Sequence, residues 1–265
     1  MSMANGGTTL LCSDLDNTLI YSHRRNLPEP RVLAEYLDGK EQSYITAYSA
    51  EQLARLGEYG VMLIPVTTRT REQYERIFVF GQNGIIPCRF ALVCNGAVLL
   101  RDGEPDEKWL AESMKIAERE FPEVKRIYGK MLETPERDHA KLIEPFLAYM
   151  LSERAESLTE ELSREADGSL VTVCTHSRKV YCMARSLTKG FAVRRLKEYL
   201  TEEGFDVKEL ITAGDSELDV PMLEAADRCF CADEIAHLVN SDDVTALPHP
   251  LSDGICKALT KNNSK

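Results

Sequence analysis

The stretch "LLCSDLDNTLIYS", residues 10–22, places two aspartates at the end of an apolar run. Asp14 and Asp16 alternate with Leu15, so both carboxylates would point the same way on an extended strand. Two neighbouring carboxylates at the end of a buried strand repel each other unless a cation or a proton neutralises them. This segment therefore predicts a buried strand that ends at a charged functional site.

The composition bounds the class of protein. The chain has 265 residues, of which 43% are hydrophobic and 28% charged, as is typical of a globular protein with one large domain or two smaller ones. A formal net charge of −11 argues against a nucleic-acid partner. The sequence has neither a membrane-spanning apolar run nor, in its first residues "MSMANGG", a secretory signal. We expect a cytoplasmic monomer or homodimer whose eight cysteines are free thiols.

Strand-like and helix-like segments alternate over the first hundred residues. Residues 61–68 and 90–100 are expected strands, and residues 49–60 and 71–81 are expected helices, the first with Ser49 as its N-cap. The exception is a β-hairpin expected within residues 31–46, turning at Asp38-Gly39. This alternation predicts an α/β fold, with a doubly wound, mostly parallel sheet and helices on both faces.

The pattern changes near residue 101 and returns near residue 185. Charged, helix-like stretches at 107–120 and 137–165 precede an expected hairpin at 169–184. The later part again alternates helix and strand, with strands expected at 209–215 and 228–232. We therefore predict a core domain formed by residues 1–100 and 185–265, with an α+β domain, residues 101–184, inserted into it.

Ligands of open α/β sheets bind at the carboxyl ends of the strands, and charged or hydroxyl side chains are expected to gather there. They are Asp14, Asp16, Thr67, Thr68, Arg69, Asp215 and Asp219, with Lys189 opening a nearby helix. Clustered carboxylates with few basic neighbours repel one another, and Mg²⁺ relieves that repulsion through oxygen ligands. A phosphate group fits the lysine and hydroxyl groups that remain.

Four short segments, taken in order, resemble the motifs of one enzyme superfamily. "DLDNT" (14–18), "VTTR" (66–69), "LTKG" (187–190) and "GDSELD" (214–219) resemble those of haloacid dehalogenase (HAD) phosphatases. "VCNGAV" (93–98) resembles the segment before the cap in the type IIB branch, which includes Cof-type, sucrose-phosphate and mannosyl-phosphoglycerate phosphatases. The resemblance covers nearly the whole chain, and it implies a Rossmann-like core with residues 101–184 as a C2 cap.

The resemblance also implies roles for the matching positions. Asp14 is expected to be the nucleophile and a Mg²⁺ ligand, and Asp16 the general acid and base, with its backbone carbonyl on the metal. Asp215 is expected to be a further metal ligand and Asp219 to support the metal site, while Thr67 and Lys189 hold the phosphoryl group. Contacts to the substrate are expected from five residues: Thr68, Arg69, Asn95, His176 and Arg178.

The chain departs from the type IIB pattern at three places. Leu218 stands where many members carry Asn, so a hydrogen bond at the metal site is lost or is supplied by Ser216 or Glu217. Asn17 stands where many members carry Gly. The segment of residues 21–50, with its own hairpin, is longer than in Cof-type phosphatases.

The predicted function is that of a Mg²⁺-dependent phosphomonoester hydrolase acting through a phospho-aspartate. Its expected substrate is a small phosphorylated metabolite, and more specifically a sugar phosphate. One alternative is a phosphosugar mutase, and another is a metabolite-binding or regulatory module with residual phosphatase activity. The individual residues also have plainer roles open to them: Asp219 can cap a helix, Asn95 can support a turn, and His176 and Arg178 can be solvated turn residues.

Overall fold

The computed structural model describes residues 7–261, and most of "MSMANGG" lies outside them. The chain forms two compact units. The first comprises residues 7–105 and 189–261, and the second comprises residues 106–188. The first boundary falls after residue 101 because β8 (Glu104–Pro105) pairs with β7 (Val98–Arg101) and stays with the first unit. That the second unit acts as a cap stays a prediction.

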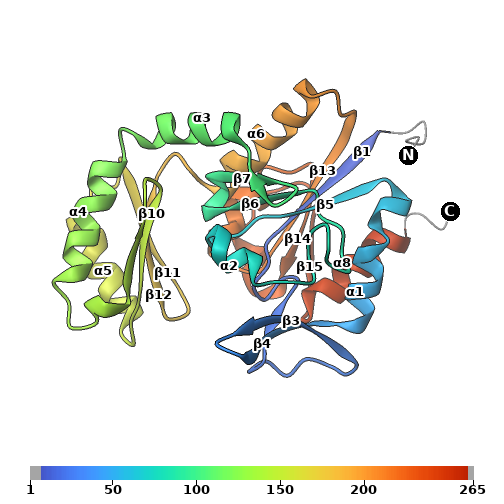
Figure 1. Cartoon of the computed structure of the whole chain (residues 1–265), viewed down its shortest axis with the longest axis horizontal. Helices are drawn as coiled ribbons and strands as arrows, with labels where there is room; N and C mark the ends of the chain where they lie inside the picture. Colours follow the sequence, from blue (N-terminus) through green and yellow to red (C-terminus); the bar gives the residue numbers. More distant parts are fainter. Residues whose placement is uncertain (1–6, 262–265) are drawn as a thin grey trace. The chain divides into compact units, whose positions relative to one another are not determined.

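A five-stranded parallel sheet forms the centre of the first unit (Figure 1). Its order is β15-β14-β13-β1-β5. The bounds are β1 Thr8–Ser13, β5 Val61–Pro65, β13 Val207–Gly214, β14 Arg228–Ala232 and β15 Val244–Leu247. Strand β1 lies between β13 and β5. The chain passes from β1 to β5 on one side of it and later forms β13 on the other side. Ligand sites of α/β sheets form at such switch points. The predicted mostly parallel sheet is confirmed, whereas β15 had no counterpart among the expected strands.

Helices cover both faces of this sheet. Helix α6 (Lys189–Glu202) packs with α7 (Val220–Leu223), and α1 (Ala47–Ala54) packs with α8 (Leu251–Lys261), on the opposite side of the sheet (Figure 1). Leu196 and Leu200 of α6 and Ile255 of α8 are buried, as apolar residues on the inner stripe of amphipathic helices. The doubly wound arrangement is thus confirmed.

Helix α1 begins earlier than predicted. Its N-cap is Thr46, whose side-chain oxygen accepts a hydrogen bond from the backbone N–H of Ser49 at 3.0 Å. Ser49 lies inside the helix and is buried, and its hydroxyl donates to Asp253 of α8. The prediction of Ser49 as the cap was wrong because Thr46, at the end of β4, has the extended backbone that a cap requires.

A hairpin leaves the sheet shortly after β1, as the sequence predicts. Strands β3 (Arg31–Leu37) and β4 (Lys40–Thr46) pair in the order β2-β4-β3 with β2 (Tyr21–Ser22). Asp38 and Gly39 both have positive φ, 51° and 73°, which matches the two-residue turn preferred in hairpins.

The helix expected at 71–81 is much shorter. Helix α2 (Arg71–Glu75) has a capping box formed by Thr70 and Gln73 but ends after five residues. Ile77 instead forms a bridge with Glu35 of β3, and Phe80 forms one with Ile86. The prediction failed because these pairings override a helix-like pattern.

The second unit contains three helices and an antiparallel sheet in the order β11-β12-β10-β9, and two of the helices, α4 and α5, pack on the sheet (Figure 1). The bounds are α3 Glu107–Ala117, α4 Phe121–Leu132, β9 Ala140–Ile143, β10 Leu147–Leu151, α5 Ala155–Glu165, β11 Val171–His176 and β12 Lys179–Ala184. The expected hairpin is confirmed as β11 and β12. The helix expected at 137–165 was wrong in its first half, because β10 pairs with β12 and buries Ala148 and Met150 among residues of α4.

The remaining short elements lie in the first unit, apart from one. Strand β6 (Phe90–Val93) pairs with β7, and short 3₁₀ turns cover Leu56–Tyr59, Cys94–Gly96, Glu217–Asp219 and Asp233–Leu238, while Arg137–His139 forms one in the second unit. Among residues 7–261, no helix combines the length and the apolar character that a membrane crossing requires.

Candidate active site

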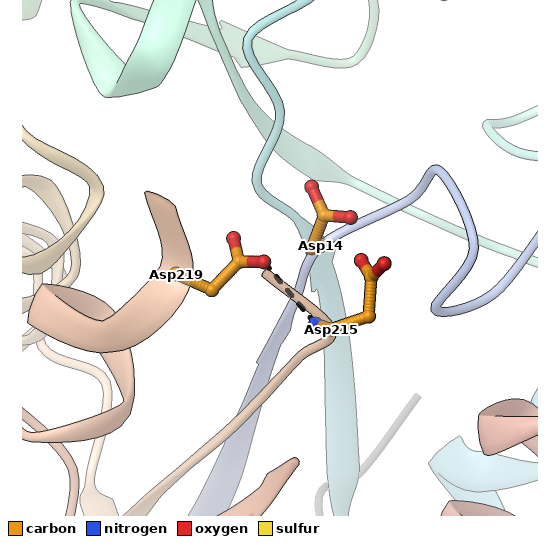
Figure 2. Close-up of side chains that lie close together, drawn as sticks. All are labelled: Asp14, Asp215 and Asp219. Atoms are coloured by element: carbon orange, nitrogen blue, oxygen red, sulfur yellow. Dashed lines mark hydrogen bonds between the residues drawn. The ribbon is translucent and has the colours of Figure 1, made fainter. Parts of the chain in front are cut away.

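Three aspartates meet at the carboxyl ends of β1 and β13. Asp14 directly follows β1, Asp215 directly follows β13, and Asp219 ends the next turn, Glu217–Asp219. Each offers a carboxylate oxygen within 4.8 Å of those of the other two (Figure 2). The sheet therefore brings together acidic residues about two hundred positions apart in the sequence.

Lys189, the first residue of α6, lies against this cluster. Its Nζ donates hydrogen bonds to Asp14 Oδ1 at 2.5 Å and to Asp219 Oδ1 at 2.6 Å, and its side chain is 3% exposed. Burial alone would lower the pKa of Lys189, but the charges of Asp14 and Asp219 more than offset it and raise the pKa. The ammonium group is therefore a permanent positive charge beside Asp14.

Asp219 holds the loop after β13. Its Oδ2 accepts hydrogen bonds from the N–H groups of Asp215 and Ser216, at 3.2 and 3.0 Å, and from the Ser216 hydroxyl at 2.9 Å. Leu218 cannot supply such a bond, and Ser216 does. Gly214 is required here because a Cβ at that position would lie 2.4 Å from Cβ of Asp219. Both carboxylate oxygens of Asp219 are thus engaged by protein donors.

Thr18 links the loop after β1 to the cluster. Its buried hydroxyl lies 3.1 Å from Asp215 Oδ1 and 3.4 Å from Asp14 Oδ2. The turn that places it needs a left-handed residue, and Asn17 has φ of 64° there. Asn is the residue that adopts this conformation most readily after Gly, which explains the substitution seen in the sequence.

The donor set fits a divalent cation with oxygen ligands. Three carboxylates and one ammonium group carry a formal net charge of −2 in a largely buried site. Lys189 engages only Oδ1 of Asp14, and among residues 7–261 Oδ2 of Asp215 receives no hydrogen bond. These oxygens are the hard ligands that Mg²⁺ prefers.

The protonation of the carboxylates reflects the same crowding. Burial raises the pKa of Asp14, with Lys189 opposing and the neighbouring aspartates adding to the rise. Burial and, after it, the charge of Asp219 together raise the pKa of Asp215 to about 7. Carboxylates with such raised pKa values in a strand-end site are typical of functional sites.

Asp16 is not part of the three-aspartate cluster and is held by Arg69. Nε and Nη2 of Arg69 donate to the two oxygens of Asp16 at 2.8 and 2.7 Å, while the Asp16 side chain stays 45% exposed. Burial opposes ionisation of Arg69, but hydrogen bonds and charge from Asp16 and Glu35 raise its pKa. A substrate contact by Arg69 stays a prediction, and it would compete with these bonds.

Thr67, which lies shortly after the end of β5, is hydrogen-bonded to the turn that contains Asn95. Thr67 is buried and accepts a hydrogen bond on its hydroxyl from the Arg69 N–H at 3.1 Å. Asn95, with φ of 60°, donates its backbone N–H to the Thr67 carbonyl at 2.9 Å. Thr68 is half-buried beside them. Their contacts with phosphate or substrate stay predictions.

His176 and Arg178 belong to the second unit. His176 ends β11, and the exposed Arg178 follows Ser177 in the turn and pairs with Glu153. The predicted substrate contacts of both residues remain predictions.

No role was predicted for two residues of the site, Thr18 and Glu35, whereas Ser216 was one of the two residues expected to supply the hydrogen bond that Leu218 cannot. Thr18 lies inside a quoted motif, so its position beside the acidic residues was an available signal. Glu35 lies outside every motif, and it is a buried acid that binds Arg69. A charged residue within the apolar run "RVLAEYL" was its sequence signal.

The fold and site define an α/β protein with an acidic cluster at the carboxyl edge of its parallel sheet. Residues 105–259, more than half of the chain, match the haloacid dehalogenase-like hydrolase family, and the chain belongs to that family. The predicted superfamily is therefore confirmed. A search of curated protein sequences found no match.

Several solved structures share the fold. The sucrose-phosphatase of Synechocystis sp., solved with sucrose and phosphate, is 17% identical with a TM-score of 0.65, covering 97% of this chain and 99% of its own. A HAD phosphatase of Bacteroides thetaiotaomicron is 18% identical, TM-score 0.56, with 100% and 98% coverage. A haloacid dehalogenase-like hydrolase of B. subtilis is 16% identical, TM-score 0.57, with 96% and 99% coverage.

Proposed function

We propose that this hydrolase is a Mg²⁺-dependent phosphomonoester phosphatase that acts through a phospho-aspartate on Asp14. The observation that carries the proposal is the buried Asp14, which lies in the cluster with Asp215 and Asp219; its Oδ1 is held by Lys189, and its Oδ2 lies 3.4 Å from the Thr18 hydroxyl. A carboxylate fixed through one oxygen presents the other as a nucleophile. The acidic neighbours provide ligands for the cation that a phosphate dianion requires.

In the first step, Asp14 attacks phosphorus and the bond from phosphorus to the leaving oxygen breaks. Asp16, the half-exposed acid of the same loop, first takes up a proton from solvent and then gives it to that oxygen, so the product leaves as an alcohol. Lys189 and Thr67 hold the phosphoryl oxygens. Because Lys189 is already charged, it stabilises the transferring group without a proton transfer.

In the second step, water attacks phosphorus and the bond to Asp14 breaks. Asp16, now a carboxylate, takes the proton from that water, and inorganic phosphate and free Asp14 are restored. Asp14, Asp215 and the Asp16 carbonyl would hold the Mg²⁺, and Asp219 supports it by fixing Lys189 and the 215–216 backbone. Bound Mg²⁺ would supply charge neutralisation for the phosphoryl oxygens.

We propose a sugar phosphate as the substrate class. The sucrose-phosphatase structure shares the fold over nearly the whole chain. In our proposal the second unit, with His176 and Arg178, acts as a C2 cap that selects the leaving group. Thr68, Arg69 and Asn95 contribute from the first unit. The eight cysteines of the described chain are all free, which supports a place in the reducing cytoplasm.

A panel of phosphate monoesters, incubated with Mg²⁺ in water labelled with heavy oxygen, tests this proposal. We expect released phosphate that carries the label, and no release in EDTA. Movement of unlabelled phosphate to another hydroxyl of the same sugar would indicate a mutase. Absence of turnover on every ester would favour the binding-module alternative.

A further inference from the structure

Glu35 is a buried carboxylate outside the residues to which the chemistry is assigned. It lies on β3, in the hairpin segment that lengthens the chain after the nucleophile loop, and is 1% exposed. Its two oxygens accept hydrogen bonds from Arg69 at 2.9 and 3.0 Å, from Arg76 at 3.2 Å and from the Ser43 hydroxyl at 3.0 Å. A buried charge persists only with such partners, so this position is built around the ion pair.

The guanidinium of Arg69 is fully committed between two carboxylates. Nε and one N–H of Nη2 bind Asp16, while the other N–H of Nη2 and one of Nη1 bind Glu35. The last N–H, on Nη1, donates to the Gln73 carbonyl at 3.2 Å. All five donors of an arginine are therefore used, and the plane of the group cannot turn without breaking several bonds.

The backbone around Glu35 is also fixed from both sides. The register of β3 against β4 shifts on either side of Glu35, as in a β-bulge, which re-aims a side chain. On the other side, Glu35 bridges Ile77, and the Phe78 N–H donates to the Ala34 carbonyl. Glu35 is thus a rigid anchor and not a mobile surface acid.

The charges of this group balance. In the resting state Asp16 and Glu35 are negative, and Arg69 and Arg76 are positive. Before the first step Asp16, whose side chain is 45% exposed, takes up a proton from solvent while Arg69 stays bound to its carboxyl group. Without the Glu35 carboxylate, Arg69 keeps its bonds to the exposed Asp16 side chain but loses the partner that fixes its opposite edge. The two side chains would then move as a pair, and the orientation of Asp16 would no longer be set by the hairpin.

We propose that Glu35 is a positioning residue, which holds Arg69 so that the Nε edge of its guanidinium orients Asp16 for proton transfer to the leaving group. This role rests on the proposed phosphatase function. The hairpin thereby becomes part of the catalytic arrangement, through one side chain. Glu35 itself touches no reacting atom.

The leaving group provides a readout that a purely structural role would not change. 2,4-Dinitrophenyl phosphate has a leaving group stable without a proton, whereas phenyl phosphate needs one from Asp16. In Glu35→Gln we expect kcat/KM for phenyl phosphate to fall about 10- to 100-fold, because misplaced acid catalysis costs about this much. The dinitrophenyl ester should lose less than about 3-fold, since general acid catalysis contributes little to it.

Further variants sharpen the test. Arg69→Lys keeps the charge but cannot bridge two carboxylates, so it should show the same selective loss. Asp16→Asn should show it too, and adding Glu35→Gln to that variant should cause little further loss, because both changes remove the same function. Glu35→Asp should recover part of the phenyl phosphate activity. The matched control is Glu104→Gln, which removes an exposed glutamate that pairs with Arg71 at 2.8 Å, and should match the wild type.

The outcomes separate the two proposals. Equal losses on both esters in Glu35→Gln and in Arg69→Lys, with an active wild type, would overturn the positioning role alone. Full activity of Glu35→Gln on phenyl phosphate would do the same. A wild type that hydrolyses neither ester with Mg²⁺ would overturn the phosphatase function and this role together.

Discussion

Two groups of ion pairs, one in each unit, differ in burial and in the sequence distance between their partners. In the first unit, Lys189 pairs with Asp14 and Asp219, residues 175 and 30 positions away, and all three side chains are less than 10% exposed. In the second unit, Arg164 pairs with Glu160 four residues earlier on α5, and both are more than two-thirds exposed. The first pairing depends on the whole fold and lies in the candidate active site. The second depends on one helix and contributes little.

The largest expected effect comes from a change in the buried ion-pair cluster around Lys189. Asp14→Asn keeps the shape of the side chain and leaves Lys189 paired with Asp219, so the fold should be retained. Turnover of an aryl phosphate should fall by at least about 10⁴-fold, because the nucleophile is lost. Steady-state kinetics and circular dichroism measure the two properties. Activity within a factor of ten of wild type would rule out Asp14 as the nucleophile.

Removal of the buried ammonium group of Lys189 should lower the stability of the fold. Lys189→Met leaves two carboxylates buried without their partner, and the free energy of unfolding should fall by about 3–5 kcal/mol in EDTA. Urea denaturation measures it. The control is Lys197→Met on the same helix, whose partner Asp227 is half exposed. If both variants were equally stable, the contrast between buried and exposed pairs would fail.

The metal should stabilise the fold in a pH-dependent way. The pKa of Asp215 is raised from 3.8 to about 7, so folded protein without metal holds a proton that the unfolded chain releases. The stabilisation that this proton on Asp215 gives the folded protein is fully present below pH 3.8 and is lost as the pH rises through about 7. Mg²⁺ replaces the proton, so its benefit should be larger at pH 8 than at pH 5.5.

Thermal unfolding with and without Mg²⁺ measures this effect. At a hundred times its dissociation constant, Mg²⁺ should raise Tm by about 5–10 °C at pH 8. The gain at pH 5.5 should be smaller. Equal Tm values in Mg²⁺ and EDTA at pH 8 would argue against the metal site.

The smallest effect is expected from a change in the exposed ion pair of Arg164 and Glu160 on α5. Arg164→Ala removes a solvated helix pair, and Tm should change by less than about 2 °C. The kcat/KM for phenyl phosphate should stay at the wild-type value. A loss comparable to that of Lys189→Met would show that exposed pairs carry more of the stability than their geometry indicates.

The fold was predictable where the sequence pattern is strong and local. The buried strand before Asp14, the Asp38-Gly39 hairpin and the parallel core all followed from alternation and turn residues. The predictions failed at 71–81 and 137–165, where helix-like segments form bridges or strands instead. In both places partners distant in sequence supply the missing hydrogen bonds, and a local pattern does not contain them.

The candidate site, like the fold, was predictable from the sequence only in part. The sequence by itself determined the family and the acidic residues at the strand ends, and it predicts a cation among them, because these depend on residue type and order. The tertiary structure decided that Asp219 fastens the 215–216 loop and Lys189, and that Glu35 reaches Asp16 through Arg69. Hydrogen bonds of this kind depend on distance and direction between side chains, and these exist only after the chain has folded.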